Sequence, residues 1–272
     1  LVPVQVYIER ASHGHFEGSL IDFYPHYFDG LYALGGNFAW MGLHLWYLEF
    51  LFIFSMLTLP LFVVGTKKKS SGPFTNAVSF FRKPGAIFLM AIPLVLMEIF
   101  VGQYRDSIGL QAFGGWSLLT YLVFFIAGYF VSLNAGFKDT IEKHRTSAIF
   151  LAFGITVVLT MNYLYDIGSI DKYEDVLTAA ASWSWLMAIF GFGSRHLSFD
   201  HPILKYANEA VLPFYILHQT IIVIFGFWIM DWELGVASKY LLLSLSSFVT
   251  IMLVYEFLIR RIKLMRFLFG MK

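Results

Sequence analysis

Long apolar segments recur along the whole chain and are separated by short polar stretches. We identify seven of them, at residues 42–64, 85–101, 116–133, 147–165, 176–192, 207–230 and 237–259. A membrane-spanning helix needs about 20 mainly apolar residues. Only 14% of the residues are charged and 58% are hydrophobic, whereas soluble domains carry about 25% charged residues. The sequence therefore predicts an all-α, polytopic transmembrane helix bundle of about seven spans.

The distribution of charge predicts how these spans are oriented. Most of the 19 basic residues fall on one set of alternate loops and in the tail, among them Lys67, Lys68, Lys69, Arg82, Lys83, Lys138, Lys143, Arg145, Arg195, Lys205, Arg260, Arg261, Lys263, Arg266 and Lys272. Basic loops stay in the cytoplasm. We therefore expect a multi-pass protein of the inner (plasma) membrane, with the N-terminal segment outside and the C-terminus in the cytoplasm.

Two parts of the chain differ in composition. Residues 1–41 are polar and aromatic and carry no long helix signal, which predicts an ordered external loop or an interfacial segment. Residues 42–272 form the membrane domain. The chain begins at Leu1 without a signal-peptide pattern, so we expect that an upstream segment was removed or never included. The absence of cysteine excludes disulfides and thiolate chemistry. The expected partners include the lipid bilayer and no nucleic acid.

Within the predicted spans, where a central charge costs roughly 2.5–3.5 kcal/mol, four polar residues stand out: His44, Glu49, Glu98 and His218. His218 shares a helix face with Tyr215, three residues earlier. Pro213 lacks an N–H and frees the carbonyl of Glu209 at membrane depth, which is tolerated only where protein or a wet cavity covers it. We interpret His218 as lining a site; the alternative is a histidine packed against a neighbouring helix.

His44 and Glu49 open the first span on its external side. They are five residues apart, roughly 140° around a helix, so they are not expected to form a dyad. A neutral histidine can accept a proton from a sugar hydroxyl, and a carboxylate can orient that hydroxyl. The alternative for His44 is an interfacial position near the headgroups. Glu98 is a candidate for acceptor binding, or else pairs with Arg105.

Basic groups crowd the loop between the fifth and sixth segments. Arg195 and Lys205, together with His196 and His201, could hold the phosphates of a nucleotide-bearing donor such as coenzyme A. Membrane topology alone also explains cations there. His13-Gly14-His15 lacks a third ligand, so we predict no metal site. No Walker loop, GxSxG or HExxH sequence is present.

Two segments resemble a known family. Residues 38–55, with His44-Leu45-Trp46-Tyr47-Leu48, and residues 191–223, ending in Leu212-Pro213-Phe214-Tyr215-Ile216-Leu217-His218-Gln219, are similar to signatures of the acyltransferase 3 family of membrane acyltransferases. The resemblance implies an all-helical protein of about ten spans. It also implies transfer of an acyl group from cytoplasmic acyl-CoA to a glycan hydroxyl, with acyl-CoA as a substrate and no bound cofactor. It assigns His44 and Trp46 from the first motif, and Tyr215 and His218 from the second, to the site.

The family's first helix carries a basic residue followed by a histidine, and no predicted helix precedes residue 42 here. We therefore expect that N-terminal helices are lacking. The leading hypothesis is a membrane O-acyltransferase that moves an acetyl or succinyl group onto a glycan. In it His44, Glu49 and His218 are the catalytic candidates, and Trp46, Glu98, Tyr215, Arg195 and Lys205 bind substrate. A multi-span transporter or glycan flippase is the alternative, since such proteins also use intramembrane polar groups and broken helices. A seven-helix receptor fits less well.

Overall fold

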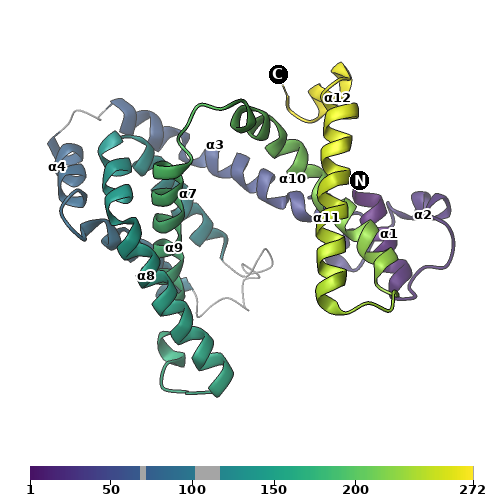
Figure 1. Cartoon of the computed structure of the whole chain (residues 1–272), viewed down its shortest axis with the longest axis horizontal. Coiled ribbons are helices and arrows are strands. Elements are labelled where there is room, and N and C mark those ends of the chain that lie inside the picture. Colours follow the sequence, from purple (N-terminus) through teal and green to yellow (C-terminus); the bar gives the residue numbers. More distant parts are fainter. Residues whose placement is uncertain (68–71, 102–116, 272) are drawn as a thin grey trace. The chain divides into compact units, whose positions relative to one another are not determined.

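The chain is built from helices. The computed structural model describes residues 1–67, 72–101 and 117–271, and within them there is no β-strand (Figure 1). Five of the described helices are long and apolar enough to cross a membrane: Leu43–Gly65, Ala135–Tyr165, Asp171–His196, Pro202–Ile229 and Val236–Ile259. Two shorter apolar helices cover Ala86–Val101 and Leu118–Ser132. The all-α transmembrane bundle is thus confirmed, while the count of seven spans stays a prediction.

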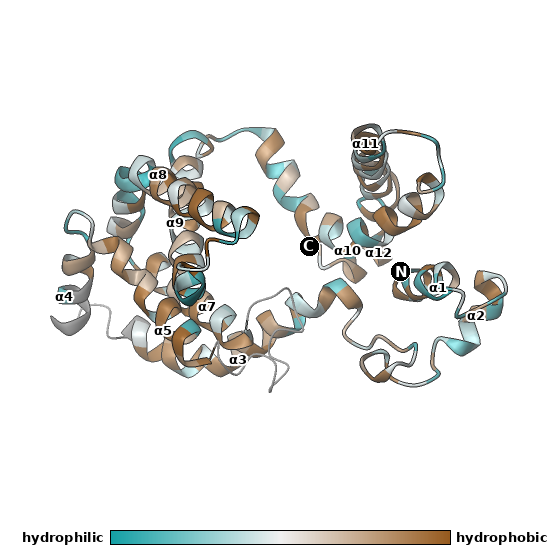
Figure 2. Cartoon of the chain, turned by 90° about the horizontal axis from the view of Figure 1, so that it is seen from below, coloured by the Kyte–Doolittle hydropathy of each residue, from teal (hydrophilic) through white to brown (hydrophobic). Residues whose placement is uncertain are grey.

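Large hydrophobic side chains cover the outer surfaces of these helices. Phe52 and Leu57 on α3 (Trp46–Lys67), and Phe150 and Phe153 on α8 (Ala135–Tyr165), are each more than half exposed. Figure 2 shows the hydrophobic colour running along such helices. Exposed apolar surface on this scale marks contact with another apolar phase. A lipid bilayer is that phase for a multi-pass membrane protein.

Several helix ends differ from the predicted ones because hydropathy follows the bilayer and not the helix. Asn134 caps α8 by accepting a hydrogen bond from the Gly136 N–H at 2.8 Å. Lys138, Lys143 and Arg145, predicted in a loop, therefore lie within α8. Arg195 lies in the last turn of α9 (Glu174–His196), and Lys205 in the first turns of α10 (Pro202–Ile229), so the prediction that both lie in a loop is wrong.

The second predicted span is also built differently. It consists of the 3₁₀ helix η3 (Ala86–Ala91) followed by α5 (Ile92–Val101). Pro93 is the second residue of α5. There its missing N–H leaves no hydrogen bond unmade. A further helix, α4 (Gly72–Phe81), occupies part of the predicted loop before it.

One compact unit comprises Leu51–Phe199. It holds most of α3, followed by α4, η3, α5, α7 (Leu118–Ser132), α8, η5 (Asp171–Tyr173) and α9. Small buried residues let α8 and α9 approach closely; they are Ala148, Ala152, Ala179, Ala188 and Gly191. Such residues are typical of helix contacts in membranes. Trp183 on α9 is buried and donates to the Ile87 carbonyl at 3.1 Å, which ties η3 to this pair.

The other unit comprises Leu1–Phe50 and Asp200–Lys272. Its C-terminal part contains α10, α11 (Val236–Val254), the π-helix η6 (Tyr255–Ile259) and α12 (Lys263–Leu268). Pro213 lies inside α10, as predicted. The core between α10, α11 and η6 is apolar and consists of Ala210, Leu217, Ile221, Ile251, Tyr255 and Ile259.

The first 41 residues of that unit are more helical than predicted. They form α1 (Val2–Ser12), α2 (Leu20–His26) and the 3₁₀ helix η1 (Tyr32–Leu34). A capping box between Ser19 and Asp22 starts α2. The side chain of Gln5, buried on α1, donates to the Thr220 hydroxyl of α10 at 2.6 Å. This segment is therefore packed onto the C-terminal helices of its own unit.

Two side chains of α1 hold the loop that follows α2. Arg10 donates to the Gly36 carbonyl at 2.7 Å and to Asn37 Oδ1 at 3.0 Å. The Tyr32 hydroxyl donates to Glu9 Oε2 at 2.7 Å. Burial and this bond to Glu9 raise the pKa of Tyr32 to about 12, so the phenol stays protonated at neutral pH.

Candidate functional site

A tight turn leads into the first motif histidine. Gly42 (φ 69°) and Leu43 (φ 53°) both adopt left-handed backbone conformations. Glycine reaches this region without cost, but a leucine there is uncommon. The 3₁₀ helix η2 (Leu43–Leu45) follows and carries His44 at its centre, immediately before α3.

His44 and Tyr215 hold each other through two main-chain carbonyls. The Tyr215 hydroxyl donates to the His44 carbonyl at 2.5 Å, and His44 Nε2 lies 3.2 Å from the Tyr215 carbonyl. Because a carbonyl only accepts, Nε2 of His44 must carry the hydrogen. The two motifs, far apart in the sequence, are thereby joined at one place on α10.

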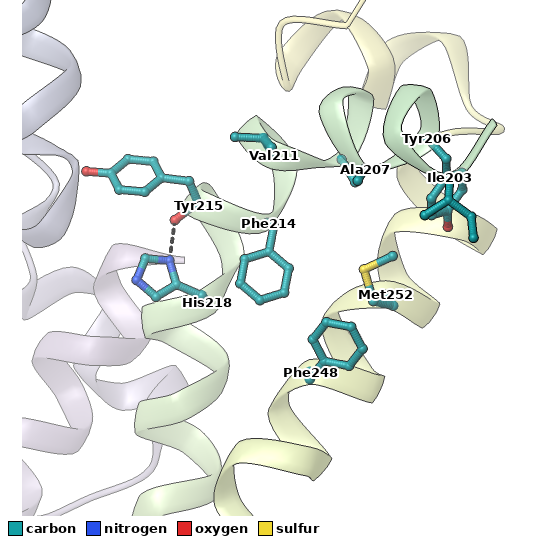
Figure 3. Close-up of a pocket in the computed structure, with 10 residues that line it drawn as sticks. Ile203, Tyr206, Ala207, Val211, Phe214, Tyr215, His218, Phe248 and Met252 are labelled. Carbon is teal, nitrogen blue, oxygen red and sulfur yellow. Dashed lines mark hydrogen bonds between the residues drawn. The ribbon is translucent and has the colours of Figure 1, made fainter. Parts of the chain in front are cut away.

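His218 uses the same carbonyl. Its Nδ1 lies 2.7 Å from the Tyr215 oxygen (Figure 3), and its ring stands edge-on to that of His44, with 5.2 Å between the ring centroids. Nδ1 therefore carries the hydrogen, and Nε2 of His218 is left with a free lone pair. The hydrogen bond of one ring nitrogen thus determines the tautomer and the chemistry of the other.

Two imidazole nitrogens are left as acceptors in this site. Nδ1 of His44 is buried and has no hydrogen-bond partner, and no partner for Nε2 of His218 occurs among the residues that the structure describes. A buried acceptor without a partner costs about 1–3 kcal/mol. Both nitrogens are suited to receive a hydrogen bond from a hydroxyl group of a ligand.

An apolar groove of about 600 Å³ runs beside His218, between α10 and α11. It is lined by Ile203, Tyr206, Ala207, Ala210, Val211, Phe214, Tyr215, His218, Phe248 and Met252. In Figure 3, Phe214, Phe248 and Met252 occupy the space between the two helices, and the second ring nitrogen of His218 points away from Phe248. The groove therefore meets the carbon edge of His218, while the free nitrogen lies on the opposite flank.

The other predicted site residues of this unit are Trp46, Glu49 and Lys205, and they differ in burial and in the groups they contact. Trp46 packs against the rings of Tyr47 and Phe50 at 6.3 and 6.2 Å between centroids. Glu49 is partly buried and makes no hydrogen bond or ion pair within the described part of the chain. Lys205 is exposed on α10.

Glu98 and Arg195 belong to the unit Leu51–Phe199. Glu98 is 4% exposed and accepts a hydrogen bond from the Thr120 hydroxyl at 2.8 Å. Arg105, its alternative partner, lies outside the described residues. Arg195 is exposed and forms an ion pair with Glu142 at 3.4 Å. Glu98 is thus buried against the helix that carries Thr120. Arg195, in contrast, lies in contact with solvent.

Two features of the site escaped sequence reasoning. One is the Tyr215 main-chain oxygen, which no residue letter reveals. The other is Gln5, which anchors α1 to α10; its signal was an uncharged polar residue within the apolar run Val2–Ile8.

Comparison with known proteins decides the family. A profile described as "Acyltransferase domain", of the acyltransferase 3 family, matches residues 8–256 and so includes both motifs. The chain belongs to the acyltransferase 3 family. Glucans biosynthesis protein C of Escherichia coli O81 is 29% identical over 256 residues, which cover 89% of this chain and 64% of the relative. The protein of that name from Salmonella paratyphi B is 25% identical over 241 residues, which cover 84% and 61%.

The resemblance read from the two motifs is thereby confirmed. The chain spans less than two thirds of the length of these curated relatives. No solved structure matches it.

Proposed function

We propose that this protein is a membrane O-acyltransferase that moves an acyl group from acyl-CoA to a hydroxyl of a glycan. The observation that carries the proposal is the free Nε2 of His218, whose tautomer is fixed by the bond from Nδ1 to the Tyr215 carbonyl. Family membership and the names of the relatives support the reaction class and a glucan acceptor. Acetyl and succinyl are the proposed acyl groups.

In the proposed reaction, Nε2 of His218 takes the proton of the acceptor hydroxyl. The hydroxyl oxygen bonds to the thioester carbonyl carbon, the C–S bond breaks, and the thiolate of coenzyme A leaves and takes up the proton from His218. A positioned base of this kind contributes typically 10²–10⁴-fold to a rate. Nδ1 of His44 accepts a hydrogen bond from a neighbouring sugar hydroxyl and so orients the acceptor.

The other predicted residues keep supporting roles in this proposal. Glu49 and Trp46 contact the acceptor, Tyr215 holds His44, and Lys205 attracts the phosphates of the donor. Glu98 and Arg195, which lie in the other unit, stay predictions for acceptor and donor binding. The donor approaches from the cytoplasm and the glycan from outside, across the inner membrane. These assignments follow the charge distribution and the motif positions.

The direct test is acyl transfer by the protein reconstituted in lipid nanodiscs. Acetyl-CoA or succinyl-CoA is supplied with a glucan, and both the released thiol and the mass of the glucan are measured. We expect thiol release together with a glucan mass gain of one acyl group. The variant His218→Gln, which keeps the size and polarity of the side chain, is the matched control and should lose the mass gain.

Two results would contradict the proposal. Thiol release without a change in glucan mass would indicate hydrolysis. Passage of unmodified glucan across a sealed membrane, with no thiol released, would indicate the transporter alternative.

A further inference from the structure

The groove between α10 and α11 has two chemically different ends. His218 stands at one end, and Tyr206 with Ile203 at the other, as Figure 3 shows. The wall between them is apolar, with Val211, Phe214 and Met252 along it. A ligand that fits this groove therefore has an uncharged middle that packs on the apolar wall. One of its ends meets His218, and the other meets the groups around Tyr206.

The Tyr206 end is positively charged. The Arg260 guanidinium lies over the Tyr206 ring, 5.4 Å from its centroid. Arg260 Nη1 donates to Glu256 at 2.9 Å, and Arg261 Nη2 lies 3.9 Å from the same carboxylate. Glu256 is thus shared by two guanidinium groups. Glu209 also acts electrostatically on Arg260, and Arg266 on the neighbouring Tyr255, so three arginines face two carboxylates and a net positive charge is left.

Arg260 retains donors for a ligand. Only its Nη1 is engaged by Glu256, and no partner for its Nε and Nη2 occurs in the described part of the chain. A guanidinium presents its N–H groups in a planar fork that matches phosphate oxygens. The exposed Lys205 adjoins Tyr206 in sequence and adds a further cation to this end of α10.

A buried hydroxyl beside Tyr206 gives an independent indication of a ligand. Tyr255 is 0% exposed, its ring packs edge-on against Tyr206 at 5.4 Å between centroids, and its hydroxyl has no hydrogen-bond partner. Tyr255 also begins the π-helix η6, which is closed by the bond from the Arg260 N–H to the Tyr255 carbonyl at 2.8 Å. Single π-turns occur frequently at functional sites.

We propose that the groove binds the pantetheine arm of the acyl donor, with its phosphates at Arg260 and Arg261 and its thioester passing the carbon edge of His218 to the flank that carries the free Nε2. This inference rests on the proposed function. Its dimensions agree, since α10 rises about 18 Å from Tyr206 to His218. The arm is roughly four peptide units long, about 14 Å when extended, and the two side chains supply the remaining reach. A volume of about 600 Å³ is typical of small-molecule sites.

The test is binding of coenzyme A to the protein in phosphatidylcholine nanodiscs, by titration calorimetry. Pantetheine, which has no phosphate, is the second probe. We expect Arg260→Gln to raise the Kd for coenzyme A about tenfold, roughly 1.4 kcal/mol, and to leave the Kd for pantetheine unchanged. Met252→Trp, which fills the groove, should weaken both ligands. Arg260→Lys, which keeps the charge and loses the fork, should lie between Arg260→Gln and the unaltered protein.

Lys263→Gln is the matched control, since it removes one exposed charge from the same tail. An equal loss in this variant would overturn the proposal in favour of general electrostatic attraction. An equal effect of Arg260→Gln on pantetheine would show a structural role and overturn it as well. So would failure of the unaltered protein to bind coenzyme A, or displacement of coenzyme A by phosphatidylglycerol, which would assign the groove to lipid.

Binding is measured without turnover, so the two proposals fail separately. Coenzyme A binding that needs Arg260, with no transfer to any glucan, would sink the proposed function and leave the donor groove intact. Transfer to glucan that is insensitive to Arg260→Gln and Met252→Trp would overturn the donor groove and leave the proposed function intact.

Discussion

The Tyr215 hydroxyl and the His44 imidazole each donate a hydrogen bond to the other residue's main-chain carbonyl, at 2.5 and 3.2 Å, across 171 positions of sequence. The pair joins the start of α3 to the middle of α10 within one compact unit. Any chemistry assigned to one motif is therefore assigned to a site shared with the other.

Replacement of His218 by alanine should lower acyl transfer at least about tenfold, which corresponds to roughly 1.4 kcal/mol of transition-state stabilisation. The reason is loss of the free Nε2 acceptor. His15→Ala is the control, because His15 is exposed and takes no part in the proposed binding or catalysis. The rate and the thermal unfolding midpoint are measured together. Full activity with a lowered midpoint would make His218 a structural residue.

Gly191 and Gly193 offer a matched pair for the contact between α8 and α9. A Cβ on Gly191 would lie 2.6 Å from Arg145 Cβ and 2.9 Å from the Ile141 carbonyl, whereas a Cβ on Gly193 meets nothing within 4 Å. Gly191→Ala should therefore destabilise the protein by about 1–3 kcal/mol through overpacking. Gly193→Ala should be neutral or stabilising by up to about 1 kcal/mol, as expected of alanine in a helix.

Thermal or denaturant unfolding in detergent would compare the two glycine variants. Equal stability would mean that α8 and α9 do not approach as closely as the structure has them.

The orientation of α8 can be tested with single cysteines, because the chain has none. Lys143 on α8 and Ser169 after it are both exposed, and about 33 Å of helix separates Lys143 from the end of α8. This exceeds the roughly 30 Å hydrocarbon core of a bilayer. In intact cells, an impermeant maleimide should label Ser169→Cys, and Lys143→Cys only after permeabilisation.

The reverse labelling pattern would invert the predicted orientation. Labelling of both cysteines in intact cells would exclude α8 as a span.

Tyr32 should make the N-terminal segment sensitive to alkali. Its folded-state pKa of about 12 lies above the ordinary value of 10.0, through burial and the bond to Glu9. Its contribution to stability is therefore constant below about pH 10 and is lost as the pH rises through 12. The stability difference between the unaltered protein and Tyr32→Phe should be steady from pH 7 to 9 and shrink above pH 10.

The measurement for Tyr32 is urea unfolding of the protein in nanodiscs, followed at each pH. A difference that stays constant up to pH 12 would show that the Tyr32 phenol is not held by Glu9.

The sequence was informative where a single physical constraint dominates. Because polar groups are costly in hydrocarbon, the apolar segments could be identified from the sequence, and His44 and His218 stood out within them. The sequence could not locate the start of α8, because residues such as Lys138 and Lys143 favour a helix as much as the apolar residues after them.

Docking of α1 also lay beyond the sequence. An isolated helix of this length is marginal in water, and α1 is stabilised by contacts such as that of Gln5 with Thr220, more than 200 positions away. Glu49 shows the opposite case. Its position within a span marked it as a candidate, and the described part of the chain supplies it with no partner.

The acceptor that fixes both imidazole tautomers is a main-chain oxygen of α10. No substitution at position 215 deletes that atom, so the side chain there can be exchanged while both histidines keep their proton arrangement. Saturation mutagenesis of Tyr215 would thus report only the contributions of its ring and hydroxyl, and not that of its main-chain carbonyl. The shared contact could be weakened only by altering the backbone itself, for example with an ester in place of the peptide bond that carries this carbonyl.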